Sequence, residues 1–207
     1  MIVLKIHSIL FVLLLSFTAI TSQASNQLLP LKAYSALPEI SMMTLSPDGS
    51  TIAFRSNANE QDLFVVKELA TGKVKGAIDV AAINPKEAYF IDNERIILKV
   101  SEYKRLPGFK GKHHVSTAFI FNVPSKKIRQ LLIPGFGTYT GQSQLGEIVG
   151  LSEDKRYAYM PAYVGEVIRN QDPIYQLTRV SLEKKRKPKS MRKGTHDAVS
   201  FFLNKQG

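Results

Sequence analysis

One serine of this 207-residue chain stands close to the sequence context of a catalytic nucleophile. Ser143 lies in the segment Gly141-Gln142-Ser143-Gln144-Leu145, and many serine hydrolases carry their nucleophile in a turn of the form G-x-S-x-G. The second glycine of that turn lets a strand pass sharply into a helix, and Leu145 takes its place here. No helical pattern follows. We therefore interpret Ser143 as an ordinary loop serine.

A histidine beside a carboxylate is a second candidate for catalysis. His196 is followed directly by Asp197, and a histidine held by an acid is the general base of many serine nucleophiles. The members of a catalytic triad meet in space rather than in sequence, however, and no serine elbow accompanies this pair. We interpret both as surface loop residues. The sequence thus predicts no catalytic residue in this chain and no independent enzymatic activity.

Two neighbouring histidines, His113 and His114, raise the question of a transition-metal site. Adjacent side chains point in different directions on most backbones, and no carboxylate lies between Glu102 and Glu147 to complete a set of ligands. The chain has no cysteine, so thiolate ligands, cysteine nucleophiles and disulfides are excluded. We predict no metal ligand, no cofactor-binding residue and no cofactor.

Three aspartates, Asp48, Asp92 and Asp154, recur at equivalent places in the chain and invite comparison with a calcium site. A calcium loop alternates its oxygen ligands densely within a dozen residues, whereas these three are far apart. In Pro47-Asp48-Gly49, proline presets φ, aspartate bonds to its own backbone and glycine accepts a positive φ. We predict that the three aspartates form turns.

The positive charge of the chain is unevenly distributed. The net charge is +11, and the stretch from Arg179 to Lys193 holds eight basic residues against the single acid Glu183. Such a cluster can bind nucleic acid or anionic lipid. No aromatic residue between Leu182 and Thr195 offers a surface on which a base could stack. We expect a solvated connection between strands and no nucleic-acid partner, while the role of the stretch stays open.

The first 24 residues have the pattern of a signal peptide. Lys5 supplies a positive charge, Ile9 to Ile20 form an apolar run, and Ser22-Gln23-Ala24 offers the small residues that a signal peptidase requires. The alternative is an uncleaved anchor, but the apolar run falls short of the roughly 20 residues that span a bilayer. We predict cleavage after Ala24, a periplasmic or secreted protein, and no membrane span in the mature chain.

The remaining sequence is built from repeated strand and turn units. After an approach segment at 25–39, units are predicted at about 40–82, 83–133 and 145–195, and a further one begins at 196–207. The 44 residues from Asp48 to Asp92 match the roughly 40–50 residues of a four-stranded propeller blade. The next interval is longer, and a loop at 103–114 accounts for part of the insertion. No helical periodicity appears after the leader.

These patterns predict an all-β fold with about three four-stranded antiparallel blades of an incomplete β-propeller, spanning 40–207. Closed propellers have four to eight blades, and an open one exposes a sheet edge. We therefore expect the chain to be the beginning of a longer protein.

The first unit resembles a blade of a known peptidase family. Leu45-Ser46-Pro47-Asp48-Gly49, the strand Ile52-Ala53-Phe54, the strand Asp62-Leu63-Phe64-Val65-Val66 and the turn Thr71-Gly72-Lys73 resemble the N-terminal propeller of prolyl oligopeptidase family serine peptidases. The dipeptidyl aminopeptidase and acylaminoacyl peptidase branches are the most similar in style. The resemblance implies that the propeller restricts entry of peptides to an active site in a C-terminal α/β-hydrolase domain, which this chain lacks.

Two alternatives stay open beside this interpretation. Similar Ser-Pro-Asp-Gly blades occur in other exported propellers, so the chain could be a binding module without peptidase activity, with peptides or envelope proteins as partners. It could also be the product of a decayed gene. The sequence leaves the substrate or partner, the oligomeric state and the number of blades in a parent protein undecided.

Overall fold

The computed structural model describes residues 39–106, 108–165, 173–195 and 197–203. The predicted signal peptide at 1–24 and nearly all of the approach segment at 25–39 lie outside these residues. The described part contains twelve strands and one short 3-10 helix, η1 (Ala58–Glu60). Within that part, no helix has the length and apolar character needed to cross a membrane.

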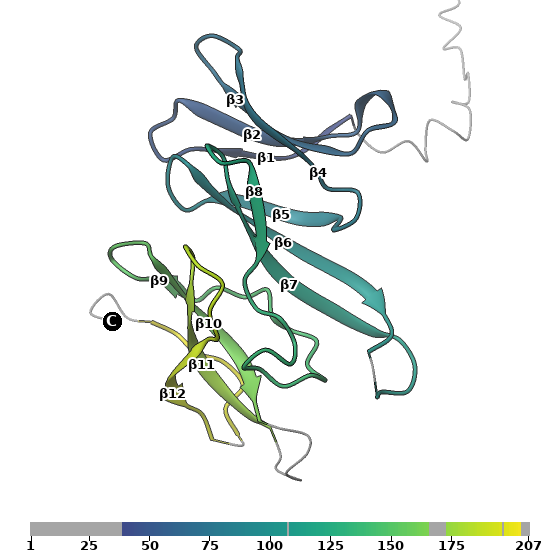
Figure 1. Cartoon of the computed structure of the whole chain (residues 1–207), viewed down its shortest axis with the longest axis vertical. Coiled ribbons are helices and arrows are strands. Elements are labelled where there is room, and N and C mark those ends of the chain that lie inside the picture. The colour runs from purple at the N-terminus through teal and green to yellow at the C-terminus, as the bar shows by residue number, and fades with distance from the viewer. Residues whose placement is uncertain (1–38, 107, 166–172, 196, 204–207) are drawn as a thin grey trace, which may run out of the picture. The chain divides into compact units, whose positions relative to one another are not determined.

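The twelve strands form three antiparallel sheets of four strands each (Figure 1). Blade 1 consists of β1 (Ile40–Leu45), β2 (Thr51–Ser56), β3 (Leu63–Glu68) and β4 (Val74–Asp79). Blade 2 consists of β5 (Pro85–Phe90), β6 (Arg95–Lys104), β7 (His113–Asn122) and β8 (Lys127–Gln130). Blade 3 consists of β9 (Gly150–Leu151), β10 (Tyr157–Val164), β11 (Ile174–Ser181) and β12 (Lys189–Lys193).

In every blade, strands that follow one another in the chain are hydrogen-bonded neighbours. The pairing is antiparallel throughout, so each blade is a meander. Blade 3 has the same connectivity, with β9 and β12 at its two edges. The four-stranded meander is the repeating unit of a β-propeller. The predicted all-β fold with about three four-stranded antiparallel blades is confirmed.

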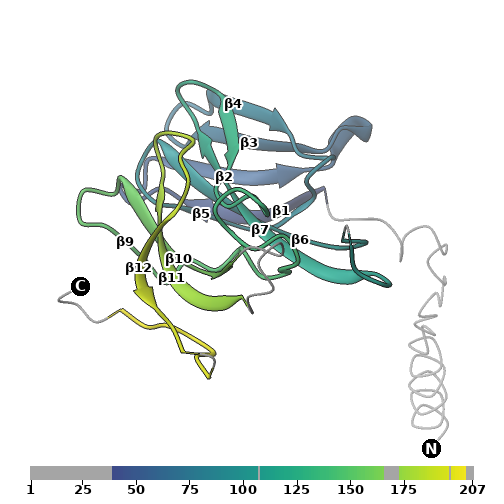
Figure 2. The ribbon, with the colours of Figure 1, turned by 60° about the horizontal axis from the view of Figure 1, so that its bottom comes forward.

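Blades 1 and 2 lie side by side and share an apolar core (Figure 2). Phe64 of β3 and Phe121 of β7 meet edge to face, with their ring centroids 6.4 Å apart. Ala53 of β2 is fully buried in the same core. Aromatic pairs in this arrangement stabilise a core by about 1 kcal/mol beyond the area that they bury.

A second core joins blade 2 to blade 3 and to the segment that connects them. Ile97 of β6 and Ile120 of β7 contribute to it from blade 2, and Met160 of β10 from blade 3. Ile96 and Leu98, the neighbours of Ile97, belong instead to the core shared with blade 1. Because successive side chains of a strand point to opposite faces, β6 is apolar on both. This explains the uninterrupted apolar run in its sequence.

The loop predicted at 103–114 corresponds to the connection between the end of β6 at Lys104 and the start of β7 at His113, but its two ends belong to the strands. Tyr103 pairs with His114 and Lys104 pairs with His113, so both strands extend well beyond their apolar portions. Tyr103 near the end of β6 is 65% exposed, whereas Leu106 in the connection and Val115 of β7 are buried. Composition alone identified this stretch as a loop because its side chains do not alternate between apolar and polar.

Candidate functional site

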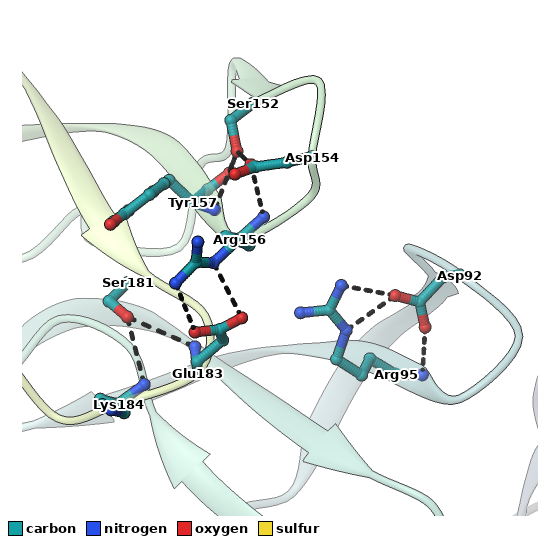
Figure 3. Close-up of polar contacts among 9 residues, drawn as sticks. All are labelled: Asp92, Arg95, Ser152, Asp154, Arg156, Tyr157, Ser181, Glu183 and Lys184. Atoms are coloured by element: carbon teal, nitrogen blue, oxygen red, sulfur yellow. Dashed lines mark hydrogen bonds and ion pairs between the residues drawn. The ribbon is translucent and has the colours of Figure 1, made fainter.

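The turns that hold Asp48 and Asp154 have the same internal hydrogen bonds. Asp48 accepts the Ser46 hydroxyl at 2.6 Å and the Ser50 N–H at 3.0 Å. Asp154 accepts the Ser152 hydroxyl at 2.6 Å and the Arg156 N–H at 3.0 Å (Figure 3). The bonds from the serine hydroxyls, followed by those from the backbone, lower the pKa of both aspartates below the ordinary value.

Asp92 forms the corresponding turn of blade 2 with different partners. Its carboxylate accepts the N–H groups of Glu94 at 3.0 Å and Arg95 at 2.8 Å, and it pairs with the Arg95 guanidinium at 2.6 Å. Figure 3 shows this pair together with the Asp154 turn. Burial by itself would raise the pKa of Asp92, but the hydrogen bonds from Arg95 and Glu94 outweigh it and lower the pKa. The turn-forming role predicted for the three aspartates is confirmed.

The segment around Ser143 ties blade 2 to blade 3. The carbonyl of Ser143 accepts the N–H of Ser116 at 2.6 Å, and the Leu145 N–H donates to the Ser116 carbonyl at 3.1 Å. The side-chain amide of Gln142 donates to the Tyr163 carbonyl at 3.1 Å, and its oxygen accepts the Tyr163 N–H at 2.8 Å. Leu145 is only 1% exposed. We call residues 142–145 the strap. Its backbone is hydrogen-bonded to β7 at the place where a nucleophile elbow would require a sharp turn.

The structure separates His113 from His114. The Nε2 atom of His113 lies 2.9 Å from the Lys110 carbonyl, whereas Nδ1 of His114 shares a hydrogen bond of 2.9 Å with the Ser101 hydroxyl. The two rings also contact different aromatic neighbours, Phe109 and Tyr103 respectively. The described residues contain no group of three histidine, aspartate or glutamate side chains placed to hold a metal ion. His196 lies outside the described residues, so its predicted loop position beside Asp197 stays a prediction.

A polar groove lies where blade 2 meets the strap. It has a volume of about 550 Å³, and its walls come from β5, β6, β7 and the stretch 143–147. Ser101 and His114 lie on one wall with Lys99, whose ammonium pairs with Glu87 at 2.7 Å. Glu147 lies on the wall beyond the strap. The groove therefore offers charges of both signs and a histidine–serine pair to a ligand.

The groove holds a serine hydroxyl hydrogen-bonded to a histidine, Ser101 with His114. A serine nucleophile needs a base that a third group orients, and donors aimed at the developing oxyanion. His114 uses Nδ1 for Ser101, and in the described part of the chain its Nε2 has no hydrogen-bonded partner. Ser101 and His114 are separated by 13 residues and meet only through the pairing of β6 with β7. No signal in the sequence indicates this contact, because the loop predicted at 103–114 includes His114.

Comparison with known proteins gives a limited similarity. No family model matches the chain, and no curated protein matches it. Among solved structures, an acylaminoacyl peptidase in complex with Z-Gly-Gly-Phe-chloromethyl ketone is 15% identical, with a TM-score of 0.43. The acylaminoacyl peptidase of Pyrococcus horikoshii is 16% identical, with a TM-score of 0.42. Each match covers 73% of this chain and 25% of the peptidase chain, so the chain spans about a quarter of the length of either.

Proposed function

We propose that this chain is a non-catalytic propeller segment of an exported, prolyl oligopeptidase-like serine peptidase, in which it selects the peptides that reach a separate catalytic domain. The observation that carries the proposal is the succession of three four-stranded blades, in two of which the same Ser-x-Asp turn joins the first strand to the second. The resemblance of the first blade to that peptidase family supports it. The peptidase activity would belong to an α/β-hydrolase domain outside these 207 residues.

The groove on blade 2 is where we propose that a peptide is contacted. Its volume of about 550 Å³ accommodates a few residues of an extended chain. Lys86 and Glu147 on its walls make no ion pair within the described residues, so they are open to a ligand. Opposite charges in one groove suit the two ends of a short peptide. Selection by such contacts needs no catalytic residue in the propeller itself.

A serine-directed fluorophosphonate probe tests the proposal. The native protein that contains this propeller is purified from its source, labelled, digested and mapped by mass spectrometry. We expect a single labelled serine that lies outside residues 1–207. Label on Ser101 or Ser143 would contradict the non-catalytic role. Sequencing of the mature N-terminus should begin at Ser25, as export through a cleaved leader requires.

The second candidate function is an exported binding module that works through partners and has no peptidase activity. The same groove favours it, because mixed charges and free polar groups serve recognition whether or not a catalytic domain is near. Absence of any fluorophosphonate label on the native protein would favour this candidate over the first. Its partners, peptides or envelope proteins, would then be recovered at fixed stoichiometry when the tagged chain is isolated from periplasm.

A further inference from the structure

The connection from β11 to β12 and the strand β12 carry a dense positive charge. Between residues 184 and 193, which we call the basic hairpin, there are seven cationic side chains and no acidic one. All seven are exposed: Lys184, Lys185, Arg186, Lys187, Lys189, Arg192 and Lys193. None of them forms an ion pair among the described residues. Glu183, the nearest acid in sequence, is already paired with Arg156 at 3.0 Å.

The basic hairpin is a fixed part of blade 3. Ser190 donates its hydroxyl to the Gln176 side chain at 2.7 Å, which ties β12 to β11. The ammonium groups of Lys185 and Lys187 lie 5.6 and 5.9 Å from the centre of the Phe136 ring. Pro188 packs so closely on Gly137 that an added Cβ there would come within 2.9 Å of it. The charges are therefore presented together by a folded surface.

Exposed apolar side chains lie beside these charges. Phe202 is 91% exposed and Met191 is 50% exposed. The two line one cavity together with Arg192 and Lys193, so the apolar and cationic side chains are neighbours in space. No described residue on the wall of that cavity is acidic. A phenylalanine left in water beside lysines and arginines is the pattern of surfaces that bind the interface of a bilayer.

We propose that the basic hairpin, with Met191 and Phe202, docks this protein on an anionic phospholipid membrane. The cations would contact lipid phosphates, and the two apolar side chains would enter the region between headgroups and acyl chains. Nucleic acid fits less well, because the basic hairpin holds no aromatic residue on which bases could stack. The charge of the basic hairpin does not depend on the peptidase assignment, whereas the exposure of Phe202 is that of the 207-residue chain.

Vesicle co-sedimentation of the full chain tests whether its positive charge is responsible for binding to a membrane. We expect binding to vesicles of phosphatidylglycerol mixed with phosphatidylcholine, and little binding to phosphatidylcholine alone. Raising salt from about 0.1 M to about 1 M shortens the screening length from about 10 to about 3 Å and should release the protein. Equal binding to both kinds of vesicle, or binding that salt does not weaken, would overturn the proposal.

A matched pair of variants locates the surface. Replacing Lys184, Lys185, Lys187 and Lys189 by serine should weaken binding roughly 600-fold, since each cation near an anionic bilayer contributes roughly fivefold in affinity. The control replaces four exposed lysines elsewhere, Lys73, Lys110, Lys112 and Lys127, and should lose much less. Equal losses in the two variants would show that net charge alone acts. Far-UV circular dichroism of both verifies that they fold.

The apolar contact has its own test, because the chain contains no tryptophan. The variant Phe202→Trp places a single reporter beside the basic hairpin. We expect its emission to shift to shorter wavelength when phosphatidylglycerol vesicles are added. Binding without a shift would remove Phe202 from the proposed surface. Poly-glutamate and a single-stranded oligonucleotide serve as competitors, and either one binding more tightly than the vesicles would replace lipid as the ligand.

Discussion

The opening turns of blades 1 and 3 use different sequences to make one set of hydrogen bonds. In blade 1 the turn is Ser46-Pro47-Asp48-Gly49, and in blade 3 it is Ser152-Glu153-Asp154-Lys155. The serine hydroxyl accepts the N–H five residues later at 3.0 Å in both. The common requirement is thus the serine and the aspartate. Proline and glycine, which marked the first turn in the sequence, ease its formation without defining it.

Replacement of the turn serine should give the largest difference in the free energy of unfolding between the two turns. Ser46 is 3% exposed, whereas Ser152 is half-buried. Ser46→Ala leaves the N–H of Thr51 without its acceptor in a buried place, so we expect a loss of about 2 kcal/mol in the free energy of unfolding. Ser152→Ala should lose about 1 kcal/mol, because water can reach that turn. Urea titration of the full chain measures both, and equal losses would contradict the role given to burial.

The fourth turn position should give opposite responses in the two blades. Gly49 has φ +72° and Lys155 has φ +52°, a region in which a side chain is strained. Gly49→Ala should cost about 1 kcal/mol, while Lys155→Gly should gain about 0.5 kcal/mol after the greater freedom of glycine in the unfolded chain is counted. The same urea titrations apply. A stabilising Gly49→Ala would mean that the turn conformation is not required.

Acid should weaken both turns. The pKa of Asp48 and that of Asp154 are lowered in the folded chain, so each carboxylate contributes stability that is present above its unfolded pKa, near 3.8. That contribution is lost as the pH falls below this value and through the folded pKa. We expect the urea midpoint to drop less steeply below pH 5 in the double variant Asp48→Asn, Asp154→Asn than in the unaltered chain. Parallel pH profiles would exclude this contribution.

The smallest effect should come from the ion pair beside the blade 3 turn. Arg156 and Glu183 are both largely exposed, and such pairs contribute little because water and salt screen them. Glu183→Gln should leave the urea midpoint within error. Arg55 and Asp62 in blade 1 make the matched comparison, because their side chains are only 13% and 20% exposed. Asp62→Asn should therefore lower the midpoint clearly, and the reverse order would contradict the comparison.

Local features of the fold could be predicted from the sequence, and features built from distant segments could not. The Asp48 turn and the strand at Leu63–Glu68 follow from residues that are adjacent in the chain. The pairing of Ser101 with His114 depends on the register between two strands whose outer halves have no apolar alternation. The groove is harder still to predict, since the stretch 143–147 lies against β7 through contacts such as that of Ser143 with Ser116, which are far apart in the sequence. The sequence predicted a loop position for Ser143 and the start of the third unit at about 145, and neither prediction indicates what the stretch contacts.

The two-sided burial of β6 has a consequence for the order in which the molecule opens. Ile96 and Leu98 are anchored in one core and Ile97 in the other, so β6 loses its protection only after both neighbouring blades have come away. Unfolding should accordingly start at the outer blades and reach the middle one last. Amide hydrogens of β6 are then expected to exchange with solvent more slowly than those of β1 or β12, and mass spectrometry after deuterium labelling would record the difference strand by strand.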